Sequence, residues 1–179
     1  MPKLRFLAAF WLPVLLWMTL IFCLSTDAGS FPHTFRLVHP ILRWLFPHVS
    51  QESVRAVVLV VRKCAHLSEY AVLALLLWRA WQHTLRQNIQ PWHSREAALA
   101  LAVSVLYAAS DEYHQSFVPS RGASLRDVLI DAVGAALGLL VAYLVCAWSA
   151  SRKASAAQPP RLVDDAARPS TAAGDSAHR

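Results

Sequence analysis

The chain has 179 residues, of which 56% are hydrophobic and 16% are charged, and its formal net charge is +6. Its mean hydropathy is +0.37, which is too apolar for an ordinary soluble protein and fits one membrane-embedded domain. The lysine and arginine residues form no basic stripe, so we expect no nucleic-acid partner. The three cysteines have neither zinc-site nor disulfide spacing. We expect no metal and no cofactor.

The first apolar segment covers residues 6–24, which carry no charge. Its length predicts a transmembrane helix. A cleaved signal peptide is the alternative, because Lys3 and Arg5 form a basic start and a passable cleavage site follows. The length of the run and its tryptophans, Trp11 and Trp17, favour a retained membrane anchor.

Residues 25–53 form a connecting segment with an amphipathic centre. Arg36, His39 and Arg43 recur there at helical spacing between apolar side chains, a pattern typical of a segment in the lipid headgroup layer. Three prolines are expected to limit any helix here to short pieces. The segment is either a lid or lipid contact, or a surface loop that covers the bundle.

Three further segments are predicted to cross the membrane, at about residues 54–78, 96–118 and 125–148. The last contains Gly134 and Gly138, a pair of small residues that lets helices approach closely. A homo-oligomer through this face is one use of the pair. We therefore predict an all-α polytopic membrane protein, a bundle of four transmembrane helices with a short amphipathic interfacial segment.

The C-terminal composition differs from that of the rest of the chain. Residues 149–179 are rich in Ala, Ser, Pro, Arg and Asp and have no apolar periodicity, which predicts a disordered tail after a domain of residues 1–148. Most of the lysine and arginine residues lie before the first helix, in the linker after the second, or in this tail. Since positive charge favours the cytoplasmic side, both termini are expected to be cytoplasmic.

Ionisable side chains interrupt the second and third predicted helices and begin the fourth. Each costs about 3 kcal/mol in hydrocarbon on insertion scales, so these groups must find partners. With four alternating helices, all of them fall in the outer half of the bundle. The members of this predicted polar pocket are Lys63, His66, Glu69, Tyr70, Asp111, Glu112, His114, Gln115, Arg121, Asp127 and Asp131.

Helical spacing predicts which side chains face the pocket. Lys63, His66 and Tyr70 share one face of the second helix at i, i+3 and i+7. Together with Arg121, Lys63 is expected to face the carboxylates of the other helices. These two cations would suit phosphate or carboxylate, while apolar walls would hold an acyl chain.

Other uses of the cluster stay open. It fits a structural ion-pair network that holds the helices in register, or a catalytic site with His66 or His114 as general base. A proton relay for a carrier is a further alternative. A metal site has suitable ligand types, but no two histidines of the cluster lie at i, i+4 and Lys63 would oppose a cation.

Three motifs follow one another along the chain. They are Lys63-x-x-His66-x-x-Glu69-Tyr70, Asp111-Glu112-x-His114-Gln115 with Arg121 after it, and Asp127-x-x-x-Asp131-x-x-Gly134. Over about residues 6–148 the chain resembles the VanZ-like family of small bacterial membrane proteins, although Asp131 stands where many members have asparagine. The resemblance implies a place in the bacterial cell envelope and an effect on glycopeptide antibiotic resistance. It implies no named reaction.

The sequence therefore predicts a multi-pass protein of the bacterial inner membrane. It is expected to bind or help to move an amphipathic envelope molecule in an outward-facing polar pocket, with membrane lipids or a lipid-linked envelope precursor as partners. The alternative is a membrane-embedded hydrolase or transferase that acts on a lipid-linked substrate through a histidine and a carboxylate. Whether the protein is an enzyme stays open at this point.

Overall fold

The computed structural model describes residues 2–26, 31–85, 92–118 and 124–157. Within these ranges the elements are α1 Pro2–Ser25, α2 Phe31–Leu45, α3 Gln51–Leu85, α4 Ser94–Gln115 and α5 Leu125–Ala157. The described chain contains no strand, so the all-α prediction is confirmed there.

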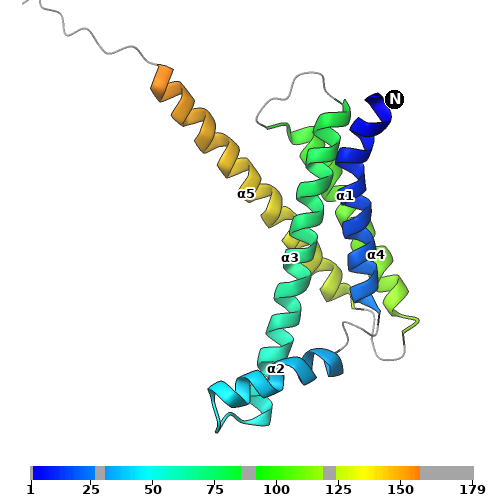
Figure 1. Cartoon of the computed structure of the whole chain (residues 1–179), viewed down its shortest axis with the longest axis vertical. Coiled ribbons are helices and arrows are strands. Elements are labelled where there is room, and N and C mark those ends of the chain that lie inside the picture. Colours follow the sequence, from blue (N-terminus) through cyan, green and yellow to red (C-terminus); the bar gives the residue numbers. More distant parts are fainter. Residues whose placement is uncertain (1, 27–30, 86–91, 119–123, 158–179) are drawn as a thin grey trace, which may run out of the picture.

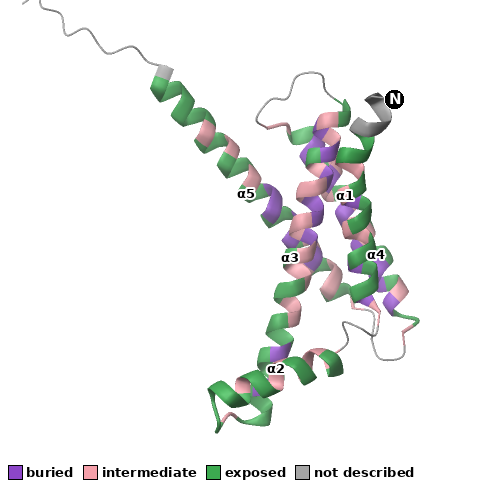
Figure 2. Ribbon diagram, in the orientation of Figure 1, coloured by how far each residue is buried: buried purple, intermediate pink, exposed green. Residues whose placement is uncertain are grey.

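The bundle is arranged around α3, which contacts each of the other four helices (Figure 1). α1 and α4 run beside α3, α5 crosses it obliquely, and α2 lies across its N-terminal end. Buried residues gather where α1, α3, α4 and α5 meet, while much of the outer surface is exposed (Figure 2). Tyr70, Leu73 and Leu77 of α3 form the centre of the core with Val14 and Ala100.

Two glycines set the crossing of α3 and α5. A β-carbon at Gly134 would lie 2.3 Å from the backbone oxygen of Leu67, and one at Gly138 would lie 2.7 Å from that of Ala71. Only a residue without a side chain allows the two backbones to come this close. The small-residue face of α5 is therefore occupied by α3 of the same chain.

α1 is fixed to the bundle by side-chain hydrogen bonds to backbone carbonyls. Trp17 Nε1 donates to the carbonyl of Glu69 at 2.9 Å. In return, the Tyr107 hydroxyl of α4 donates to the carbonyl of Met18 at 2.6 Å. Ile21 is buried one turn further on. These contacts make α1 part of the packed structure.

The amphipathic segment forms one helix, where short pieces were expected. α2 covers Phe31–Leu45 and continues through Pro40. Pro32 lies in its first turn, where a missing amide hydrogen costs nothing, and Pro40 removes one internal hydrogen bond without ending the helix. The predicted amphipathic element between the first two long helices is therefore present, but as one continuous helix instead of short pieces.

The C-terminal boundary also differs from the prediction. α5 continues past Trp148 to Ala157, so residues 149–157 are helical where a disordered tail was expected. Four of these nine residues are alanine, which has the highest helix propensity and favours a helix even without apolar periodicity. Residues 158–179 lie outside the described residues.

Two of the described helices are long and apolar enough to cross a membrane. They are Leu7–Ser25 in α1 and Leu125–Ala156 in α5, and the most apolar 18 residues of each have a mean hydropathy of 2.3. Only 11% and 28% of the residues in these two 18-residue stretches are buried, unlike the core helix of a soluble protein. Within the described residues α3 and α4 do not meet the same criterion, so the predicted four-span bundle is not confirmed.

Candidate functional site

A cavity of about 300 Å³ opens at the end of the bundle that α2 covers. Four helices form it: the end of α1, the start of α2, the middle of α3 and the last turns of α4. Its walls consist of Ile21, Leu24, Ser25, Thr34, Val61, Arg62, Ala65, His66, Glu69 and Asp111.

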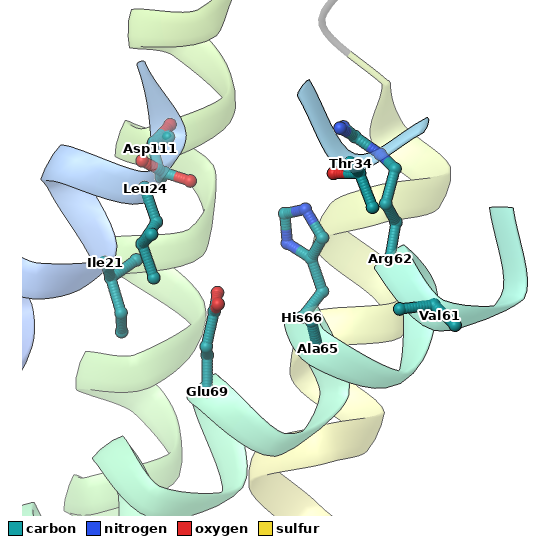
Figure 3. A pocket seen from close by; sticks show the side chains of 10 residues that line it. Ile21, Leu24, Thr34, Val61, Arg62, Ala65, His66, Glu69 and Asp111 are labelled. Carbon is teal, nitrogen blue, oxygen red and sulfur yellow. The ribbon is translucent and has the colours of Figure 1, made fainter. Parts of the chain in front are cut away.

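The ionisable groups of the cavity come from α3 and α4. Figure 3 shows the ring of His66 between Arg62 and Glu69, with the Asp111 carboxylate projecting from α4. Ile21 and Leu24 close the wall on the α1 side. The cavity therefore combines one guanidinium, one imidazole and two carboxylates with apolar walls.

His66 also contacts a carboxylate outside the cavity. Its Nδ1 lies 3.4 Å from Oδ1 of Asp131, whose side chain is 0% exposed. This distance is longer than a normal hydrogen bond, and neither oxygen of Asp131 has a hydrogen-bond partner among the described residues. Because an unpaired buried carboxylate is costly, the approach of His66 is the contact that offsets the charge of Asp131.

Lys63 does not line the cavity, contrary to the face predicted for α3. Its ammonium forms an ion pair with Asp127 and joins α3 to α5. Tyr70, on the same predicted face, is entirely buried, with its ring 6.4 Å from that of Tyr107. The face that lines the cavity is instead Arg62, His66 and Glu69, at i, i+4 and i+7.

The polar residues at the end of α4 have separate partners. Gln115 Nε2 donates to Oδ2 of Asp111 at 2.9 Å and holds that carboxylate at the cavity wall. Glu112 Oε2 accepts the backbone amide of Ser124 at 2.8 Å, directly before α5. A carboxylate is stabilising at the N-terminus of a helix, so Glu112 fixes the start of α5 and does not line the cavity.

Two predicted site residues remain. His114 is not among the residues that line the cavity, and its ring packs against Phe22 at a centroid distance of 4.6 Å. Arg121 lies outside the described residues. Among the residues that the structure describes, no three histidine, cysteine or acidic side chains are grouped so that they could hold a metal ion.

The chain matches a known family over most of its length. The family model described as VanZ/LLP1 matches residues 10–146. The chain belongs to the VanZ/LLP1 family. The resemblance inferred from the three motifs is thereby confirmed. No curated protein and no solved structure was found to match the chain.

Some cavity residues of this VanZ/LLP1 chain were missed by sequence reasoning. Arg62 could have been found, because it stands at helical spacing with His66 and Glu69. Thr34 could not, because it reaches the cavity only through the return of α2 over the bundle. Ser25, the last residue of α1, is 3% exposed and lines the cavity. It could not have been found either, because α1 has no polar periodicity that would mark one face.

Proposed function

We propose that this VanZ/LLP1 protein is a multi-pass membrane protein that binds a zwitterionic, amphipathic molecule of the bacterial cell envelope. The observation that carries the proposal is the cavity, which sets Arg62 against Glu69 and Asp111 within apolar walls. The cavity binds a lipid or a lipid-linked precursor, and the protein holds this molecule or helps to move it.

The ligand class follows from the charges at the cavity wall. Arg62 lines the cavity and Lys63 does not, so Arg62 is the lysine or arginine that the described wall presents to a ligand. Its planar fork matches phosphate or carboxylate, while Glu69 and Asp111 suit an ammonium or hydroxyl groups. A cavity of about 300 Å³ is at the small end of ligand sites and suits a headgroup, with acyl chains leaving along α1.

Four membrane-spanning helices are part of the proposal. α4 has 22 residues, enough to span the hydrocarbon layer, and the 35 residues of α3 reach about 50 Å. The polar residues of α3 lower its hydropathy, but Lys63 and His66 face carboxylates of α5. Charges that are paired inside a bundle are the ones a membrane helix tolerates.

The orientation rests on charge and on aromatic side chains. Arg152 and Lys153 follow the apolar part of α5 at the end of the bundle where the N-terminus lies. Trp92 packs there at ring distances of 5.2 Å from Trp78 and 5.3 Å from Tyr143, as aromatic side chains do at a membrane interface. We therefore place this end at the cytoplasm of the inner membrane, with the cavity facing outward.

Native mass spectrometry of the full chain, extracted with its lipids in mild detergent, tests the proposal. Arg62→Gln should lower the retained phospholipid about tenfold, because a charge-assisted hydrogen bond contributes about 1.5–3 kcal/mol. Arg55→Gln is the matched control, since Arg55 is an exposed arginine of the same helix. Equal retention in wild type and Arg62→Gln would exclude the cavity as the binding site.

An effect on glycopeptide tolerance is the expected consequence in cells. A strain that lacks the protein should have a lower minimal inhibitory concentration of a lipoglycopeptide. The wild-type chain and Arg55→Gln should restore it, and Arg62→Gln should not, at equal amounts in the membrane. Restoration by Arg62→Gln would separate any resistance effect from the cavity.

A further inference from the structure

We propose that His66 and Asp131 make the cavity a hydrolytic site that cleaves a phosphodiester of the bound headgroup. In this proposal His66 is the catalytic base and Asp131 is a positioning residue behind it. The inference rests on the proposed function, because the substrate is the headgroup that the cavity holds.

The orientation of the His66 ring is the first observation that supports this site. Nδ1 of His66 faces the carboxylate of Asp131 at 3.4 Å, so the opposite edge of the ring, with Nε2, points away from that carboxylate. The ring itself stands in the cavity wall between Arg62 and Glu69 (Figure 3). One nitrogen thus faces a carboxylate, at a distance longer than a normal hydrogen bond, while the ring borders the space where a ligand binds.

The burial of Asp131 is the second observation that supports this site. Its side chain is 0% exposed, and neither oxygen has a hydrogen-bond partner among the described residues. A carboxylate beside Nδ1 keeps the proton on that nitrogen, leaves Nε2 as the acceptor, and stabilises the imidazolium that forms. Core packing alone gives no reason for an acid at this position, since a buried carboxylate costs free energy.

The position of Arg62 assigns the bond that reacts. A zwitterionic headgroup with its phosphate at Arg62 and its ammonium at Glu69 spans His66, which lies between them. The phosphodiester then lies next to the imidazole. Arg62 neutralises the negative charge that grows on the phosphoryl oxygens during attack.

The reaction balances with water as co-reactant. Nε2 of His66 accepts a proton from a water molecule as its oxygen forms a bond to phosphorus. One of the two ester bonds between phosphorus and oxygen breaks, and the departing alkoxide takes the proton from the imidazolium. The products are one phosphomonoester and one alcohol, and no electron is transferred to or from a redox partner.

The test uses the purified full chain in vesicles of phosphatidylethanolamine that carries a fluorescent acyl chain. Labelled phosphatidic acid or labelled diacylglycerol, separated by chromatography, reports cleavage on either side of phosphorus. Wild type should form one of these products. His66→Gln should lower turnover about 100-fold or more, while native mass spectrometry shows lipid retention within about twofold of wild type.

Two further variants separate positioning from folding. Asp131→Asn should lower kcat at least about tenfold with KM changed less than about threefold, and Asp131→Glu should recover part of kcat. His114→Gln is the control for replacing a histidine, because His114 packs on Phe22 and does not line the cavity. It should leave turnover unchanged.

The outcomes distinguish this inference from the function on which it rests. Wild-type protein that retains phosphatidylethanolamine but forms neither product overturns the hydrolytic site and leaves lipid binding in place. Protein that retains no lipid overturns both. Equal losses of retention and turnover in Asp131→Asn, without recovery in Asp131→Glu, reduce Asp131 to a structural residue and overturn its positioning role.

Discussion

Replacing Gly134 by alanine should move α5 away from α3. The new β-carbon would lie 2.3 Å from the oxygen and 2.9 Å from the Cα of Leu67, whereas ordinary contact begins at 3.4 Å. Both neighbours are backbone atoms, so relief requires a helix shift of roughly 1 Å. Such overpacking costs about 1–3 kcal/mol, and the higher helix propensity of alanine returns less than about 1 kcal/mol of this.

The free energy of unfolding, measured by circular dichroism during titration with sodium dodecyl sulfate in mixed micelles, should fall by about 1–2 kcal/mol. Gly138→Ala should cost less, because its closest atom is 2.7 Å away. Val133→Leu is the control, since Val133 is 52% exposed on the neighbouring face of α5. It should stay within about 0.5 kcal/mol of wild type.

The displacement should reach the cavity as well. α5 carries Asp127 and Asp131, which face Lys63 and His66 of α3. A shift at the crossing separates both pairs, so Gly134→Ala should also retain less phospholipid than wild type. If Gly134→Ala is as stable as wild type and retains as much lipid, the close crossing of α3 and α5 is refuted.

Three further predictions concern single contacts, each measured by the same unfolding titration. Lys63→Met and Asp127→Leu should each lower the free energy of unfolding by about 1–3 kcal/mol. The double variant should lower it by less than the sum of the two, because it leaves no unpaired charge. Strictly additive losses would show that the ion pair does not form. Tyr107→Phe should cost about 1 kcal/mol by losing the hydrogen bond to Met18, and no loss would argue that α1 is held by apolar packing alone. Glu112→Ala should cost about 1 kcal/mol by removing the acceptor at the start of α5, whereas an effect on lipid retention alone would place Glu112 in the binding site.

The convergence of distant polar residues could be anticipated from the sequence. His66 and Glu69 lie in the middle of an apolar helix, and Asp111 lies near the end of another. Helices that alternate in direction bring these levels together, and ionisable groups in an apolar setting must find one another. The structure places all three at one cavity.

The rotation of α3 could not be anticipated. Arg62 and Lys63 are adjacent cations, and a helix turns by about 100° from one to the next, so either could have faced the cavity. The close contacts of Gly134 and Gly138 decide the matter, because they bring Leu67 and Ala71 against α5. Lys63 stands one turn before Leu67 on that face and therefore reaches Asp127.

The path of α2 depends on tertiary contacts that no local pattern encodes. Its apolar and basic residues predict a helix at a headgroup layer, and the helix is present. It lies across the N-terminal end of α3 and contacts that helix, with Thr34 at the cavity wall. Val54 and Val58 of α3 are buried in this N-terminal part of the helix. Sequence alone leaves open whether such a segment covers a site.

In the proposed complex, Arg62 faces two carboxylates, Glu69 and Asp111, around a zwitterionic headgroup. The most direct test is the lipid selectivity of the purified protein, measured by native mass spectrometry after exchange with equal amounts of phosphatidylethanolamine and phosphatidylglycerol. Wild type should retain mostly phosphatidylethanolamine, and Glu69→Gln with Asp111→Asn should shift the preference toward phosphatidylglycerol, which lacks the ammonium group. The same lipid ratio in wild type and the double variant would contradict the account.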